Sequence, residues 1–169
     1  HVLICVDRDG TLIVNDGFVG REHGWKEKIR LNNPVIHFLS FLQTKYKTTT
    51  IVVSNQSGVA RGYFNQQRVK EVNRVVRSLL KKQNISVDVW EYCPDVDELY
   101  AHAHPEVSWQ ARYVLRSTRR KPSKAMVDDA LRLMGKGLEE FSERIVIGNH
   151  DDDRLLAANL HASFIDVGQ

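Results

Sequence analysis

Residues 2–11 read VLICVDRDGT, and this stretch decides the fold. Its first five residues form a nearly continuous apolar run, which is typical of a strand buried on both faces of a parallel sheet. Asp7 and Asp9 follow at once, so two carboxylates leave the strand on the same side. Like charges that close need a cation between them or a role in proton transfer. The alternative is a polar turn, in which aspartate and glycine are common.

The rest of the chain alternates between strand and helix patterns. Apolar and β-branched runs predict strands at 50–54, 87–92, 144–147 and 163–167. Apolar residues at helical spacing predict helices at 33–46, 65–82, 126–133 and 153–160. At the first of these helices, Asn33 can cap and Pro34 fits the first helical position. This alternation predicts an α/β fold with a doubly wound, Rossmann-like parallel sheet.

The length and composition indicate one globular domain. A chain of 169 residues suits a single domain, here 1–169, and the predicted elements leave no stretch for a large cap domain. Residues 93–118 lack a clear period and are interpreted as a loop or flap. With 42% hydrophobic and 27% charged residues, the composition excludes disordered and collagen-like chains. No apolar run approaches the ~18 residues that would suggest a membrane span, so no membrane partner is expected.

Charge and cysteine content bear on partners and location. The net charge of +3 and the pI near 8.9 permit a phosphorylated small molecule or a nucleic acid as partner, without requiring either. Cys5 and Cys93 cannot form a disulfide framework and lie in no CxxC pair, so we expect a reducing compartment such as the cytoplasm. The chain begins at His1 without a methionine, which leaves a removed targeting segment and a mitochondrial location open.

Three further polar clusters follow predicted strands or precede predicted helices. Residues 54–58, SNQSG, offer a hydroxyl, amide donors and a flexible glycine, which suit a phosphate at close range. Arg120 and Lys121 place two cations before a helix, and residues 148–153, GNHDDD, offer the oxygen ligands that Mg²⁺ prefers. The structural alternatives are a loop, a solvated basic surface and an acidic first helical turn. Ligands bind beyond the carboxyl ends of strands in such folds, so the clusters together predict one site.

In this order the segments resemble the haloacid dehalogenase-like (HAD) phosphatases. The resemblance covers about residues 2–167 and rests on DRDGTL at 7–12, Ser54, Lys121 and GNHDDD at 148–153. The string SNQSGVARG at 54–62, together with Arg120-Lys121-Pro122, is similar to the branch of histidinol-phosphate and heptose-1,7-bisphosphate phosphatases.

The resemblance implies a role for each candidate residue. Asp7 would be the nucleophile that forms an aspartyl phosphate, and Asp9 the general acid and then base. Ser54 and Lys121 would contact the transferring phosphoryl group. The residues expected to face the rest of the substrate are Asn55, Arg61 and Arg120. The groups expected to hold Mg²⁺ are the Asp7 carboxylate, the backbone carbonyl of Asp9 and the side chain of Asn149.

Two departures from the family bear on metal binding. Most relatives have an aspartate at position 149, whereas this chain has Asn149, which removes one formal charge and predicts weaker metal binding unless Asp152 or Asp153 compensates. Of the four ligands of the structural zinc loop in the heptose branch, only Cys93 survives here. His102 and His104 could replace others, but we expect no structural zinc.

The sequence therefore leaves three functions open. The first is an active Mg²⁺-dependent phosphomonoesterase that acts on a small phosphate ester. The second is a catalytically impaired HAD fold that serves as a structural or assembly component, for example in a ribonucleoprotein. The third is a nucleic-acid 3′-phosphatase, for which a basic surface would favour a polyanion.

Overall fold

The central element of the fold is a parallel sheet of five strands. The computed structural model describes residues 1–168 and gives the strand order β3-β2-β1-β6-β7, with every pairing parallel. The strands are β1 (Val2–Val6), β2 (Thr48–Asn55), β3 (Val89–Cys93), β6 (Glu143–Gly148) and β7 (Ser163–Asp166). The apolar run after His1 is therefore the middle strand, and the predicted doubly wound α/β fold is confirmed.

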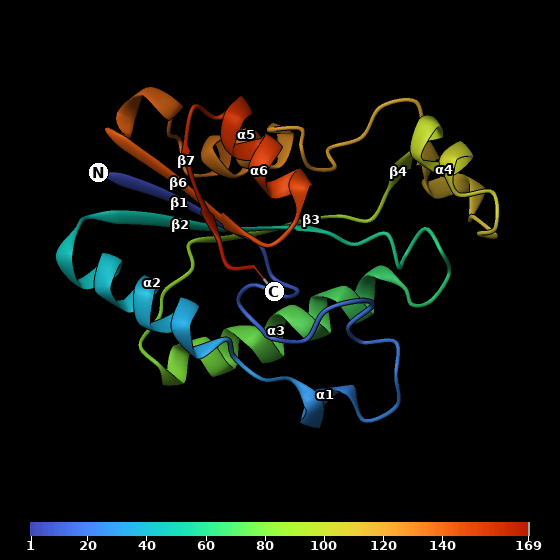
Figure 1. Cartoon of the computed structure of the whole chain (residues 1–169), viewed down its shortest axis with the longest axis horizontal. Coiled ribbons are helices and arrows are strands. Elements are labelled where there is room, and N and C mark those ends of the chain that lie inside the picture. Colours follow the sequence, from blue (N-terminus) through green and yellow to red (C-terminus); the bar gives the residue numbers. More distant parts are fainter. Residues whose placement is uncertain (169) are drawn as a thin grey trace.

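Helices cover both faces of the sheet (Figure 1). The helices that pack on it are α2 (Asn33–Lys45), α3 (Gln66–Lys82), α5 (Ala125–Leu133) and α6 (Asp151–Asn159). Along β1 the side chains alternate. Ile4 and Val6 belong to the core on the side of α2 and α3, whereas Leu3 and Cys5 belong to the core on the side of α5 and α6. This burial on both faces explains why β1 reads as a continuous apolar run.

Several element boundaries differ from the prediction. The strand expected at 50–54 extends to Thr48, because Thr48 pairs with Val2 at the start of β1. The predicted cap Asn33 is the first residue of α2, and Asn32 precedes it without a side-chain capping bond. Asn65 caps α3 by accepting a hydrogen bond from the Arg68 N–H at 3.0 Å. The last helix begins two residues earlier than expected, at Asp151.

The segment 93–118 has more structure than the loop that was expected. It contains β4 (Val96–Asp97), α4 (Glu98–Ala103), a 3₁₀ turn at Ala111–Tyr113 and β5 (Val114–Leu115), with β4 and β5 paired in parallel. Aromatic rings hold it together, since the Tyr100 ring lies 4.4 Å from His104 and 6.0 Å from Trp109. Elements of two to six residues are too short to show a period, which is why the pattern missed them.

A short helix between β1 and α2 was also not predicted. Helix α1 (Trp25–Lys28) lies in the connection between β1 and α2, where Trp25 is buried. Figure 1 shows α1 beside α3 on one side of the sheet and α4 at the opposite end of the molecule from the N-terminus. Within residues 1–168, no helix has the length and apolar character needed to cross a membrane.

Candidate active site

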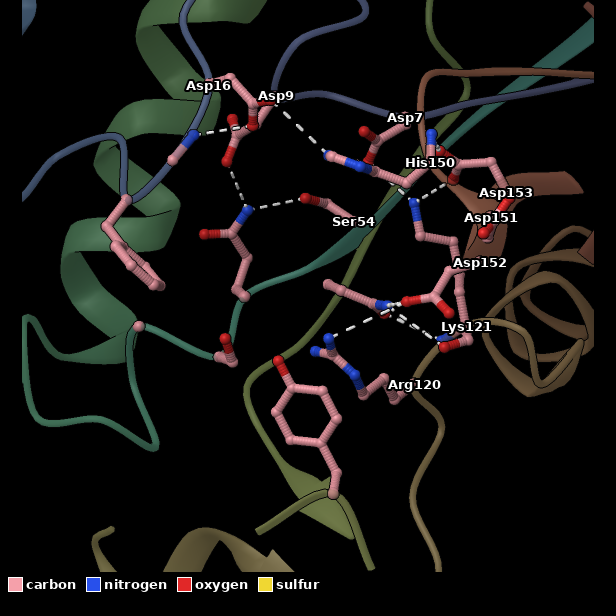
Figure 2. Close-up of a pocket in the computed structure, with 17 residues that line it drawn as sticks. Asp7, Asp9, Asp16, Ser54, Arg120, Lys121, His150, Asp151, Asp152 and Asp153 are labelled. Carbon is pink, nitrogen blue, oxygen red and sulfur yellow. Dashed lines mark hydrogen bonds and ion pairs between the residues drawn. The ribbon is translucent and has the colours of Figure 1, made fainter. Parts of the chain in front are cut away.

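The predicted site residues meet at one edge of the sheet. Because β1, β2 and β6 run in parallel, the residues that follow them gather at their carboxyl ends. Asp7 and Asp9 follow β1, Ser54 is the next-to-last residue of β2, and residues 150–153 follow β6. They line a cavity of about 470 Å³, shown in Figure 2. The structure thus brings together three segments that are far apart in the sequence.

Lys121 is the centre of a buried charge cluster. Its Nζ donates to Asp7 Oδ1 at 2.8 Å and to Asp153 Oδ1 at 2.6 Å (Figure 2). The lysine is 4% exposed and Asp153 only 1%. The second oxygen of Asp153 accepts the backbone N–H groups of Asn149 and His150, both at 3.2 Å, and so caps the first turn of α6. Asp153 therefore connects the lysine to the start of α6.

Burial and neighbouring charges shift the pKa values of Asp7 and Lys121. Burial raises the pKa of Asp7 to about 6, against the opposing effect of the Lys121 ammonium group, and Asp153 adds to the rise. Burial alone would lower the pKa of Lys121, but the two carboxylates outweigh it and raise that pKa above its usual value. Lys121 thus stays charged, and Asp7 is a carboxylate with an unusually high proton affinity.

A second network holds the carboxylate of Asp9. Gln56 Nε2 donates to Asp9 Oδ2 at 3.0 Å and to Ser54 Oγ at 2.7 Å. Arg8, which is fully buried, donates to both oxygens of Asp9 and to Asn73 Oδ1 on α3 at 2.8 Å. Neither Arg8 nor Asn73 was among the predicted site residues. The available signal was an arginine placed between two aspartates, since such a position invites pairing with one of them.

The residues predicted to hold Mg²⁺ provide suitable donors. Lys121 donates to Asp7 Oδ1, and within residues 1–168 no group donates to Asp7 Oδ2. Asn149 Oδ1 accepts a hydrogen bond from Thr11 Oγ1 at 3.3 Å, so the amide oxygen faces the turn after Asp9. Carboxylate, amide and carbonyl oxygens are the hard donors that Mg²⁺ prefers, so Asp7, Asp9 and Asn149 fit the ion.

Other predicted metal roles stay predictions. Both oxygens of Asp153 already accept hydrogen bonds, one from Lys121 and the other from two backbone N–H groups. In this arrangement Asp153 pairs with the lysine. In the described part of the chain, no three histidine, cysteine or acidic side chains form a metal-binding group. Cys93, the remaining candidate zinc ligand, directs its thiol to the Asp95 carbonyl oxygen at 3.6 Å.

The predicted substrate residues take different positions. Asn55 lines the cavity, accepts the Lys121 backbone N–H at 2.9 Å and donates to Asp152 at 3.2 Å. Arg120 also lines the cavity, lies 4.5 Å from the Tyr100 ring, and has a buried Nη1 with no hydrogen-bond partner among residues 1–168. Arg61 is not a lining residue.

Arg61 instead packs between two aromatic rings. Its guanidinium group lies 5.3 Å from the ring of Phe18 and 4.7 Å from that of Trp109. Phe18 and Tyr100 also line the cavity, and Phe18 makes an edge contact with Tyr63 at 4.7 Å. Arg61 thus joins the loop after β1 to the flap.

A parallel α/β sheet whose carboxyl edge carries this Asp-x-Asp pair, a strand-end serine and a buried lysine is the arrangement expected from the resemblance to the HAD-like phosphatases. The chain belongs to the polynucleotide kinase 3 phosphatase family, whose model matches residues 2–153. The fold agrees with solved structures. A protein from Mesorhizobium loti that is described as a putative HAD-like phosphatase has a TM-score of 0.75 and 23% identity over 94% of this chain and 68% of that one.

A second structure, a D,D-heptose 1,7-bisphosphate phosphatase from B. bronchiseptica complexed with magnesium and phosphate, has a TM-score of 0.70 and 20% identity over 97% of this chain and 79% of that one. Among curated relatives, the heptose-1,7-bisphosphate 7-phosphatase of Haemophilus influenzae is 34% identical over 56% of this chain and 49% of its own length. That of Thermoplasma acidophilum, marked as probable, is 26% identical over 95% of this chain and 86% of its length. The chain spans 49%, 58% and 63% of three bacterial relatives.

Proposed function

We propose that this protein is a Mg²⁺-dependent phosphomonoesterase that acts on a small phosphate ester through an aspartyl-phosphate intermediate. One observation carries the proposal: the buried Lys121 lies between Asp7 and Asp153 in the same cavity as Ser54 and Asp9. A nucleophile next to a fixed cation and a hydroxyl donor is the arrangement that phosphoryl transfer requires, because the reaction depends on positioning and on neutralising charge.

The proposed reaction has two steps. A carboxylate oxygen of Asp7 attacks phosphorus, the bond between phosphorus and the ester oxygen breaks, and protonated Asp9 gives its proton to the leaving alcohol. Asp9 then takes a proton from water, whose oxygen attacks phosphorus and releases phosphate from Asp7. Lys121 and Ser54 bind phosphoryl oxygens in both steps. When bound, Mg²⁺ would offset the negative charges of the nucleophile and the phosphate.

The resting position of Asp9 bears on this role. Arg8 and Gln56 both donate to the Asp9 carboxylate, which is the arrangement of an ionised acid. The same donors would stabilise the carboxylate that exists before the second step, when Asp9 accepts a proton from water.

A sugar phosphate with a second anionic group is the substrate class that we favour. Several relatives are named as heptose-1,7-bisphosphate phosphatases, and a cavity of about 470 Å³ accommodates a ligand of that size. The buried Nη1 of Arg120 can donate to a second phosphate. The activities of these relatives favour a small ester over the assembly component and the nucleic-acid 3′-phosphatase.

The test is phosphate release by the full chain from a panel of esters with Mg²⁺ present. The panel contains heptose 1,7-bisphosphate, histidinol phosphate and a 3′-phosphorylated oligonucleotide, and Asp7→Asn is the matched control. We expect the sugar bisphosphate to be hydrolysed fastest and the variant to be inactive. Wild type no faster than Asp7→Asn on every ester would contradict phosphatase activity. A preference for the oligonucleotide would contradict the proposed substrate class.

A further inference from the structure

The aspartates of the cavity differ in how their charges are paired. The six that line it are Asp7, Asp9, Asp16, Asp151, Asp152 and Asp153. Five have a lysine or arginine partner: Lys121 for Asp7 and Asp153, Arg8 for Asp9, Arg154 for Asp151 and Arg120 for Asp152. Within residues 1–168, Asp16 pairs with no lysine or arginine. Its nearest ionisable partner is His150, at 3.6 Å, which is charged only when protonated.

Asp16 also lies directly beside the candidate metal site. Asn149 Nδ2 donates to Asp16 Oδ2 at 3.4 Å. Gly10, which has a positive φ of 71°, shows how close these groups are. A Cβ at that position would lie 3.1 Å from Asn149 Cγ and 3.2 Å from Asp16 Cγ. The Gly10 N–H donates to the Asn15 carbonyl oxygen at 2.8 Å, which ties the start of the Asp16 loop to the turn after Asp9.

The candidate metal site is short of negative charge without Asp16. Asp7 is its one charged oxygen donor, and the Lys121 ammonium group 2.8 Å away offsets that charge. Asn149 and the carbonyl of Asp9 contribute oxygen atoms but no formal charge. The number of charged ligands sets the affinity of a site for a divalent cation. A nearby carboxylate that no lysine or arginine neutralises would therefore strengthen binding.

We propose that Asp16 is the second negatively charged group of the magnesium site formed by Asp7, the Asp9 carbonyl and Asn149. This inference rests on the Mg²⁺-dependent function proposed above. Asp16 exchanges its contact with the Asn149 amide N–H for an interaction with the cation or with a water molecule bound to it. Since the Asp16 loop includes Phe18, which lines the cavity, cation binding also holds this loop against the site.

Magnesium affinity measured by calorimetry at neutral pH tests the role of Asp16. We expect Asp16→Asn to weaken Mg²⁺ binding about tenfold, as loss of an outer-shell partner does. Asp151→Asn removes the same charge from the same cavity at a residue that pairs with Arg154, and it should bind Mg²⁺ as wild type does. The double variant Asp16→Asn with Asn149→Asp moves the negative charge from position 16 to position 149, which is in contact with it. It should regain most of the wild-type affinity for Mg²⁺.

A second readout separates loss of binding from loss of folding. The rise in melting temperature on adding Mg²⁺ reports affinity for the folded chain, and the melting temperature in EDTA reports stability alone. Asp16→Asn should reduce the rise in melting temperature caused by Mg²⁺ and leave the melting temperature in EDTA close to that of wild type. Unchanged Mg²⁺ affinity in Asp16→Asn overturns the inference, as does an equal loss in Asp151→Asn. If wild type binds no Mg²⁺, the inference fails, and phosphate release in EDTA then decides separately whether the protein is a phosphatase.

Discussion

Arg8 holds the carboxylate of its chain neighbour Asp9 through two parallel hydrogen bonds, from Nε to Oδ1 at 2.7 Å and from Nη2 to Oδ2 at 3.0 Å. The arginine side chain is 0% exposed and the aspartate 13%. Such a bidentate pair fixes direction as well as charge. The proposed acid and base is thus positioned by a residue that the substrate cannot reach, and the contact of Arg8 with Asn73 anchors this pair to α3.

Removal of this buried arginine should be costly. We expect Arg8→Met to lower the free energy of unfolding by about 3–5 kcal/mol, because it leaves a mostly buried carboxylate without its cation. The matched control is Lys28→Met, which breaks the pair with Glu22 at a position where the lysine is 58% exposed. That change should cost under about 1 kcal/mol. Urea unfolding followed by circular dichroism measures both, and equal losses would contradict the structural role of Arg8.

Asp7 predicts a pH dependence of stability in the metal-free protein. Its pKa is raised from 3.8 to about 6, so the folded state favours the protonated form. The stability contributed by this protonation is complete below pH 3.8 and is lost as the pH rises through about 6. Asp7→Asn cannot ionise. Relative to this variant, wild type in EDTA should lose up to about 3 kcal/mol between those limits.

Urea unfolding of wild type and Asp7→Asn across this pH range tests the prediction. The comparison uses the difference between the two proteins at each pH, so titration of other groups largely cancels. A difference that stays constant with pH would show that Asp7 does not titrate there. Added Mg²⁺ should restore the stability of wild type at neutral pH and have little effect on the variant, because the ion favours the ionised carboxylate.

Much of the site could be predicted because strand ends determine it. Asp7, Ser54 and Asn149 each lie at or just beyond the carboxyl end of a strand whose apolar or β-branched pattern is clear, and parallel strands bring these ends to one edge. The contacts that hold these residues were not predictable in the same way. Arg8 reaches Asn73, 65 residues away, and Asp16 meets Asn149, 133 residues away. Such pairs depend on how the loops and α3 pack, which a local pattern does not contain.

Lys121 should be required for both activity and stability. In Lys121→Met, Asp7 and Asp153 lose the ammonium group that lies within 2.8 Å of each. Loss of that cation raises the pKa of Asp7 further, so the folded protein favours a protonated carboxyl and loses stability as the pH rises. We expect kcat to fall by at least about a hundredfold. The loss of unfolding free energy should be larger at pH 7.5 than at pH 5, and a loss independent of pH would argue against a buried charge cluster.

Arg120 should determine specificity for a second phosphate. Its Nη1 is buried without a hydrogen-bond partner in the described chain, while its guanidinium plane is held near the Tyr100 ring and close to Asp152. A second phosphate could accept from this donor, so we expect Arg120→Ala to raise KM for a sugar bisphosphate by about ten- to a hundredfold. The KM for the corresponding monophosphate should change much less, since in the proposed mechanism the reacting phosphate contacts Lys121 and Ser54 instead.

Steady-state kinetics with both sugars measure this selectivity. Arg112→Ala is the control, because Arg112 is an exposed arginine of the 93–118 flap that contacts Gln110 and Tyr113 and does not line the cavity. It should leave both KM values near those of wild type. An equal rise for the two sugars in Arg120→Ala would indicate general damage to the cavity rather than a lost phosphate contact. A rise restricted to the bisphosphate would assign the second phosphate to Arg120, and Arg120→Lys should then restore only part of the effect because lysine cannot donate through a planar fork.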